Sequence, residues 1–228
     1  MPNYYPIMLD VRGRTAIVVG GDRTAAEKAA SLCASGARVI LLNTEFCHEV
    51  LALCERFQVT LYYKAYERGD LAGAFVVVAA TNNPELIEAI WTETQERGQL
   101  VNIVDVPARC SFIVPSIMRR DQLTIAVSTE GASPSLAKRI RQRLEGLFPP
   151  AYGKYLRLAS IVRKHLRKTG LTYAQRDDFF GDYFTSDILE HLVAGDEQKA
   201  VASTTELLEL YDVNVSPITI ATDLKEAV

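Results

Sequence analysis

A glycine-rich turn at residues 18–25, VVGGDRTA, has the residue types that hold the phosphates of a dinucleotide. In such a turn the first glycine permits a tight bend, the second lets the backbone approach the pyrophosphate, and a third small residue allows close helix packing. Gly20 and Ala25 fill the outer positions, but Asp22 fills the middle one. A carboxylate there takes up room and repels phosphate, although the amides of the following helix would still face a ligand. Alone, the pattern is explained more simply as a strand-to-helix turn without a ligand.

The residues after the second predicted strand bear on the choice of cofactor. Sites for NAD usually place an acid there for the ribose hydroxyls, whereas sites for NADP place an arginine near the 2′-phosphate. The local sequence is Asn43-Thr44-Glu45, without an arginine. If a cofactor binds, the sequence therefore favours NAD over NADP.

Asp105 is the candidate for acid–base chemistry. It ends an apolar run, QLVNIVD (99–105), that is typical of a strand, and open parallel sheets bind ligands at the carboxyl ends of their strands. A carboxylate at that point can accept a proton as a general base. A role in a loop or helix cap explains the same position equally well.

Cysteine and histidine give no convincing metal site. The four cysteines lack CxxC spacing, which favours reduced thiols over a disulfide framework: Cys33, Cys47, Cys54 and Cys110. Cys47, His48 and Cys54 could share a metal, but they fall on a helix-like stretch, EFCHEVLALCERF (45–57), and structural zinc usually takes four well-spaced ligands. All three histidines lie on helix-like segments: His48, His165 and His191. We therefore predict no metal-binding residues.

The elements that must position these residues alternate between strand and helix in the first half of the chain. β-branched runs predict five strands at 14–20, 37–43, 59–64, 74–80 and 99–105. Helical spacing falls between them at 23–35, 45–57 and 84–97. This alternation indicates an α/β fold with a doubly wound parallel sheet.

After Asp105 the pattern changes. SFIVPSIMRRDQLTIAVSTEG (111–131) predicts two short strands separated by a basic turn, and Ser133 and Pro134 predict the start of a helix through Leu147. That helix contains the basic run KRIRQR (138–143). From Pro149 onward the spacing is helical, except that NVSPITIATDLKEAV (214–228) shows no clear period and predicts a tail or a loose strand.

Composition indicates a globular protein and excludes two classes. The 228 residues are 48% hydrophobic and carry a net charge of −3, which argues against a general nucleic-acid binder, although a modest polyanion could bind the basic run. The longest apolar run, AGAFVVVAA (72–80), is far shorter than the roughly 20 residues of a membrane span. The first ten residues do not look like a secretion signal, so we expect a cytoplasmic protein without membrane association.

Three stretches together resemble one family. They are YYPIMLDVRGRTAIVVGG (4–21), VVVAATNNPELI (76–87) and VNIVDVPARCSFIVPSIMRRDQLTIAVSTEGASPSLAKRIRQRLE (101–145), with weaker similarity through residues 179–208. The third is the most specific, because it combines an aspartate-proline loop, an SFIxPS turn, a strand and a basic helix capped by Ser-Pro. The chain resembles the precorrin-2 dehydrogenases and sirohydrochlorin ferrochelatases of sirohaem synthesis, including the N-terminal module of sirohaem synthase.

This resemblance implies an organisation and an activity. It implies a Rossmann-like NAD-binding domain over residues 1–113, a small mixed dimerisation and substrate region over 114–148, and a helical domain over 149–228. The implied protein is a homodimer that dehydrogenates precorrin-2 to sirohydrochlorin with NAD. The resemblance leaves open whether it also inserts iron, for which Fe²⁺ would be a substrate.

The resemblance also assigns site residues. The family's catalytic aspartate falls on Asp105, and a serine that is modified in some relatives falls on Thr129, beside Ser128. Glu130 stands where relatives commonly have glycine. The family's nucleotide contacts fall on Arg23 and Thr24 in the turn and on Thr44 and Glu45 after the second strand. We also predict that Gly20 and Gly21 of the turn contact the cofactor.

The implied tetrapyrrole substrate carries eight carboxylates, which guanidinium groups can grip with two hydrogen bonds each. An amphipathic helix in water would show the same basic residues. Ser128, Thr129 and the amides before Ser133 could hold a further carboxylate, although Ser133 more simply caps its helix. The basic candidates in the central block are Arg109, Arg119, Arg120, Lys138, Arg139 and Arg141.

The effect of Asp22 on nucleotide binding distinguishes three possible functions. We expect the flexible Gly21 to let the backbone shift so that the Asp22 carboxylate points outward, which would preserve a dehydrogenase. If the nucleotide site is instead impaired, the chain is a tetrapyrrole-binding or chelatase-only relative. A redox-sensing NAD-binding module without catalysis is the third reading.

Overall fold

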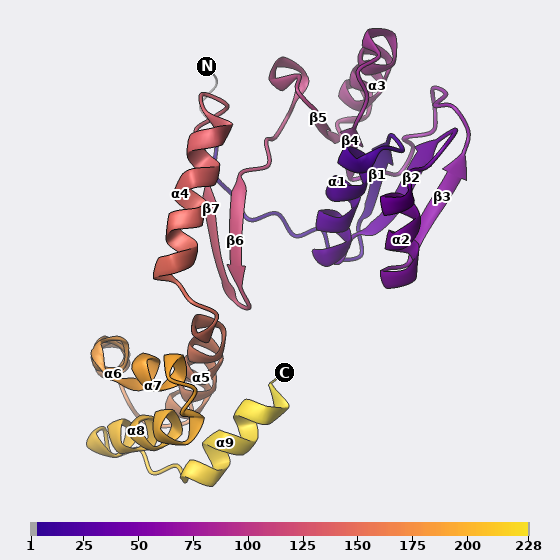
Figure 1. Ribbon diagram of the computed structural model, residues 1–228. Coiled ribbons are helices and arrows are strands. Elements are labelled where there is room, and N and C mark those ends of the chain that lie inside the picture. The colour runs from indigo at the N-terminus through magenta and orange to yellow at the C-terminus, as the bar shows by residue number, and fades with distance from the viewer. Residues whose placement is uncertain (1–3, 228) are drawn as a thin grey trace. The chain divides into compact units, whose positions relative to one another are not determined.

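The computed structural model describes residues 4–227 (Figure 1), so residues 1–3 and 228, at the ends of the predicted first and last domains, lie outside it. The chain divides into two compact units between Val114 and Pro115. The finer division into three parts, at residues 113 and 148, stays a prediction.

The first unit is built on a parallel sheet of five strands in the order β3-β2-β1-β4-β5. All five predicted strands are confirmed, each within the predicted range. The central strands are apolar on both faces because helices and loops cover both sides of the sheet. The strands are β1 (Thr15–Val19), β2 (Arg38–Asn43), β3 (Val59–Tyr63), β4 (Val76–Ala79) and β5 (Leu100–Ile103).

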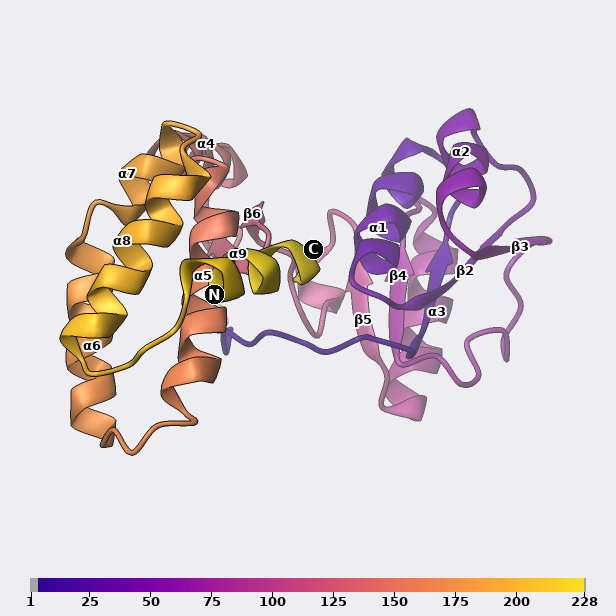
Figure 2. The same ribbon diagram turned by 90° about the horizontal axis from the view of Figure 1, so that it is seen from below.

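Three helices pack on the two faces of this sheet (Figure 2). Helices α1 (Arg23–Ala34) and α2 (His48–Arg56) share one apolar core with the sheet, and α3 (Pro84–Arg97) contributes to the other. The predicted α/β doubly wound fold is therefore confirmed. Its strand order reverses between β1 and β4, and in such folds ligands bind at this switch point, outside the carboxyl ends of the strands.

Helix α2 begins three residues later than the predicted helical stretch. The backbone of Cys47 is extended and forms the N-cap, so Glu45 lies in the loop before the helix. Among residues 4–227, no three histidine, cysteine, aspartate or glutamate side chains are grouped as a metal site would require.

The second unit starts with an antiparallel hairpin, β6 (Ser116–Arg120) and β7 (Leu123–Val127), against which α4 (Pro134–Leu147) packs. The start and end of α4 are as predicted, and Ser133 caps it by accepting a hydrogen bond from the Leu136 amide. The predicted basic turn is wrong. Arg119 and Arg120 end β6, and the turn falls on Asp121, whose φ of 56° is a left-handed conformation that aspartate tolerates better than most residues.

Five further helices enclose the core of the second unit. Tyr155 and Tyr183 lie at its centre with stacked rings, and each hydroxyl donates to the other residue's carbonyl oxygen, at 2.9 and 3.0 Å. No helix within residues 4–227 is long and apolar enough to cross a membrane. The helices are α5 (Ala151–Leu166), α6 (Tyr173–Thr185), α7 (Ile188–Val193), α8 (Glu197–Leu210) and α9 (Pro217–Glu226).

Helix α9 corrects the prediction of a tail or loose strand at 214–228. Ser216 caps it by accepting from the Thr219 amide at 3.1 Å, and Pro217 is its first residue. Ile220 and Leu224, one helical turn apart, are both buried. The alternation in ITIAT obscured a serine-proline start signal of the kind that marked α4 correctly.

Candidate active site at the carboxyl edge of the sheet

The two glycines of the β1–α1 turn are fixed by close packing. Gly20 has a φ of 144°, and a Cβ there would lie 2.5 Å from the Ala80 carbonyl oxygen and 3.3 Å from the Ala25 Cβ. A Cβ on Gly21 would collide with the carbonyl oxygen of Glu45. Both positions therefore require glycine for packing within the protein, independently of any ligand.

Asp22 is the N-cap of α1. Its Oδ1 accepts a hydrogen bond from the Ala25 amide at 2.8 Å, so the carboxylate turns toward the first turn of the helix. The expectation that Gly21 would point this carboxylate outward is therefore wrong. The cause is local, because an aspartate before a helix gains more from satisfying a free amide than from full exposure.

The helix start nevertheless keeps two donors for an anion. The backbone N–H groups of Arg23 and Thr24 have no hydrogen-bond partner within residues 4–227. The Arg23 guanidinium is exposed and lies 3.3 Å from the Glu27 carboxylate, a surface pair that holds it weakly. These groups fit the phosphates of a dinucleotide, although Asp22 brings an opposing charge to the same turn.

The β2–α2 loop is joined to this turn. The Cys47 amide donates to the Gly21 carbonyl at 2.8 Å, and the Asn43 side chain donates to the Glu45 carbonyl at 2.6 Å. Thr44 and Glu45 are exposed. The structure thus brings together the predicted nucleotide residues of the two loops, and Asn43 is a positioning residue that the sequence did not reveal.

Asp105 lies on a loop at the same edge of the sheet, two residues beyond β5. Its φ is 58°, its side chain is exposed, and its carboxylate has no hydrogen-bond or ion-pair partner in the described part of the chain. A non-glycine residue in the left-handed region is uncommon and often marks a functional position. The carboxylate is therefore free to meet a ligand.

The Cys110 thiol closes the loop that carries Asp105. Its Sγ lies 3.2 Å from the Ile103 amide, 3.3 Å from the Ile103 carbonyl and 3.4 Å from the Val106 carbonyl. Burial raises the pKa of this thiol, which keeps it protonated and able to donate. The buried Asn102 donates to the Phe112 carbonyl at 3.0 Å and fastens the base of the loop. A lone asparagine in an apolar strand was the sequence signal for this role.

Arg109 follows the same loop but is engaged by α3. Its guanidinium stacks 3.9 Å above the Trp91 ring and forms an ion pair of 2.7 Å with Glu88. This candidate for carboxylate binding already has an anionic partner.

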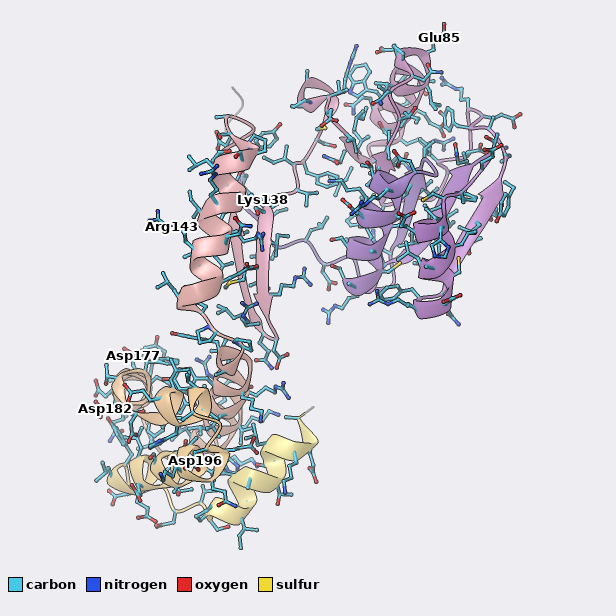
Figure 3. All side chains as sticks on the ribbon, viewed as in Figure 1. Glu85, Lys138, Arg143, Asp177, Asp182 and Asp196 are labelled. Atoms are coloured by element: carbon cyan, nitrogen blue, oxygen red, sulfur yellow. The ribbon has the colours of Figure 1, made fainter. Side chains whose placement is uncertain are left out.

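The basic residues of the second unit that were predicted to bind substrate carboxylates fall into two groups. Some are exposed, and others already contact groups of this unit. Arg119 on β6 and Lys138 on α4 are exposed, and Figure 3 labels Lys138 on its helix. Arg120 instead binds the carboxyl end of α4, since its Nε donates to the Phe148 carbonyl at 2.9 Å. Arg141 is paired with Glu145. Arg120 and Arg141 are thus occupied by contacts within this unit.

Ser128 and Thr129 form the turn before α4. The Ser128 hydroxyl accepts from the Glu130 amide and the Thr129 hydroxyl from the Ser133 amide, both at 3.0 Å. Each hydroxyl still has its own O–H to donate. Glu130 has a φ of 51°, which explains why glycine suits this position better.

Comparisons with known proteins agree with this architecture. An NAD(P)-binding family model matches residues 7–116, and a model of the central region of sirohaem biosynthesis proteins matches residues 120–147. The siroheme synthase of Nitrosococcus oceani is 32% identical over 90% of this chain and 44% of its own length, and that of Methylobacillus flagellatus is 34% identical over 89% and 44%. The chain thus spans less than half the length of these relatives.

A solved structure supports the fold. The structure titled SirC, precorrin-2 dehydrogenase, superposes with a TM-score of 0.72 and 24% identity, covering 89% of this chain and all of that one. It shares the parallel sheet, the hairpin and the helical carboxyl-terminal region.

Proposed function

Since the chain belongs to the family that unites the N-terminal module of sirohaem synthase with the precorrin-2 dehydrogenases, we propose that it dehydrogenates precorrin-2 to sirohydrochlorin with NAD. The main support is that the Asp105 carboxylate, which has no partner among residues 4–227, lies at the same edge of the sheet as the nucleotide turn. A fold of this kind binds its ligands along that edge.

In this proposal the β1–α1 turn and the β2–α2 loop hold the dinucleotide. The amides of Arg23 and Thr24, with the Arg23 guanidinium, bind the phosphates, and the Glu45 carboxylate accepts from a ribose hydroxyl. Bound NAD would take up the hydride that leaves the macrocycle. Thr44, exposed beside Glu45, completes the predicted contacts.

Asp105 acts as the general base. Removal of two hydrogens from precorrin-2 releases one as hydride and the other as a proton, and the Asp105 carboxylate accepts that proton. Substrate carboxylates are bound by Arg119 and Lys138, which are exposed, and by the O–H groups of Ser128 and Thr129, which have acceptor bonds but remain free to donate.

The direct test is turnover. The full chain is mixed with precorrin-2 and NAD, and NADH absorbance is followed with sirohydrochlorin formation. We expect one NADH for each sirohydrochlorin formed. Binding of precorrin-2 without NADH formation would refute the dehydrogenase activity and favour a tetrapyrrole-binding or chelatase-only protein.

Iron insertion is a second candidate function, favoured by the same free carboxylate. Asp105 can accept pyrrole protons as Fe²⁺ enters sirohydrochlorin. The test is sirohaem absorbance after sirohydrochlorin and Fe²⁺ are added without NAD. A rate equal to the uncatalysed one would refute it.

We further propose that the protein is a cytoplasmic homodimer. The β6–β7 sheet has only two strands, and small sheets with open edges are stabilised by pairing or covering. Light scattering should give twice the chain mass, and a mass equal to one chain would refute the dimer. The four free cysteines accord with a reducing compartment.

A further inference from the structure

A pocket lies at the amino edge of the parallel sheet, opposite the edge that carries the candidate active site. Its volume is about 730 Å³, and glycines at 13 and 73 contribute to its wall. It opens where the strands begin, whereas the nucleotide turn and Asp105 lie where they end. At about 3.3 Å per residue, the five residues of β1 separate the two edges by roughly 16 Å. The principal side chains that line it are Arg14, Thr15, Arg38, Phe75, Arg97 and Gln99.

The first residues of the strands hold this pocket in shape. Arg38 donates its amide to the Arg14 carbonyl at 2.9 Å, and Phe75 donates its amide to the Thr15 carbonyl at 2.8 Å. The register of the sheet also places Thr15 opposite Arg38. Backbone hydrogen bonds therefore fix the arginines on adjacent segments.

The pocket has an excess of positive charge. Arg14 lies 4.2 Å above the Phe75 ring, and Arg38 has only a long contact of 3.5 Å with the Thr15 hydroxyl. Neither guanidinium has a carboxylate partner within residues 4–227. Arg97 pairs through its Nε with the buried Glu93, but none of the described residues that line the pocket is acidic.

Gln99 makes the floor rigid. Its Nε2 donates to the Leu71 carbonyl at 2.6 Å and to the Ala74 carbonyl at 2.8 Å, which fastens the turn before β4. Its Oε1 is buried and has no hydrogen-bond partner in the described part of the chain.

We propose that this pocket binds a small polyvalent anion, a polycarboxylate or a polyphosphate, at a site separate from the active site. Arg14 and Arg38 both line the pocket from the starts of adjacent strands, so each guanidinium can bind one anionic group of the same molecule. A guanidinium binds carboxylate and phosphate oxygens in the same forked geometry, so two anionic groups are needed and either chemistry is suitable. Anion binding at this pocket can be tested whether or not the protein is a dehydrogenase.

The test uses pyrophosphate and citrate as probes of the two chemistries, with acetate at equal ionic strength as the monovalent comparison. A ligand that binds only the folded chain raises its melting temperature in a saturable way. We expect such a rise, and a measurable Kd by calorimetry, for at least one of the two polyanions and not for acetate. The probe with the lower Kd shows whether the pocket prefers polyphosphates or polycarboxylates. No saturable effect of either polyanion would overturn the proposal.

Substitutions at single arginines test whether the anion binds at this pocket. Arg38→Gln removes an exposed guanidinium that makes one long contact. We expect this change to lower the affinity for the tighter-binding probe by about tenfold. Arg56→Gln is the matched control, because Arg56 is also exposed, lies 5.6 Å from an aromatic ring and does not line the pocket. Equal loss in both variants would overturn the site.

Amide chemical shifts provide a readout that does not depend on a variant. Titration of the unaltered chain with the better probe should move the signals of Gly13 and Gly73. Movement confined to Gly20 and Gly21 would place the anion at the nucleotide turn and refute the second site.

Discussion

The carboxylate of Asp22 accepts a hydrogen bond from the Ala25 amide at 2.8 Å. One residue thus caps α1 and stands where a dinucleotide turn usually has its middle glycine. Its negative charge stabilises the helix start and at the same time opposes a phosphate. Cofactor affinity and helix stability are therefore set against each other at this position.

Replacing Asp22 should strengthen NAD binding. Asp22→Asn keeps a capping oxygen but removes the charge, so we expect NAD affinity to rise by about two- to fivefold with little loss of stability. Asp22→Gly also removes the side chain and should bind still more tightly. Calorimetric titration of the three proteins measures this. Unchanged affinity in both variants would show that Asp22 does not oppose the cofactor, and binding by the variants alone would support the chelatase-only reading.

Asp105→Asn should abolish most of the proposed dehydrogenase activity. An amide cannot accept the proton, so we expect kcat to fall by about 10²- to 10⁴-fold while NAD affinity stays the same. Asparagine tolerates the left-handed backbone at this position, so the loop should keep its conformation.

The matched control is Asp212→Asn. Asp212 also has a positive φ, 57°, but follows α8 in the second unit. It should leave kcat unchanged. If Asp105→Asn turned over at the wild-type rate, Asp105 would not be the general base.

Glu93 should make the first unit sensitive to acid. Its side chain is 1% exposed and accepts from the Tyr66 hydroxyl at 2.6 Å, the Gly69 amide at 2.9 Å and the Arg97 Nε at 2.8 Å. Burial opposes ionisation, but these hydrogen bonds outweigh it and hold the pKa of Glu93 below its ordinary value of 4.5. The stability it provides is therefore complete above that value and lost as the pH falls below it.

Glu93→Gln should lower the free energy of unfolding by about 1–3 kcal/mol at neutral pH. Urea denaturation from pH 7 to pH 3 should show the difference from wild type shrinking below pH 4.5. Glu96→Gln, in an exposed pair with Arg68, is the control and should change stability little. A constant difference across the pH range would contradict the role of ionised Glu93.

Gly21→Ala should destabilise the protein, because the added methyl group meets the Glu45 carbonyl oxygen. Overpacking of this kind costs about 1–3 kcal/mol. Gly146→Ala is a useful comparison, since that glycine lies within α4 and a Cβ there would meet no atom within 4 Å from outside the adjacent helix backbone in residues 4–227, and alanine should stabilise the helix. Thermal unfolding of both variants measures the contrast, and equal melting temperatures would contradict the close contact at Gly21.

Most helices and strands were predictable because the sequence patterns that predict them are local. The strands read as short apolar runs, and the Ser133-Pro134 pair marked the start of α4. The last helix was missed because alternating threonine and isoleucine resemble a strand, while the burial of Ile220 and Leu224 depends on distant helices.

The sequence predicted which loops lie at the carboxyl edge of the sheet, but not the partners of the candidate side chains. Arg109 is bound by Trp91 and Glu88, and Arg120 by the Phe148 carbonyl, across 18 to 28 residues of sequence. Arginine side chains are long enough to reach such partners, and only the folded chain brings the partners close. The capping geometry of Asp22, in contrast, spans three residues and was a local alternative to the outward orientation.

The contact between Gly21 and the Glu45 backbone limits how this protein can change over evolutionary time. Position 22 is exposed and can accept an aspartate, whereas any side chain at position 21 would force the two loops apart. Substitutions at the exposed positions 22, 44 and 45 leave this contact intact. Such substitutions can alter which ligand the turn accepts, while the fold that presents the turn is inherited unchanged.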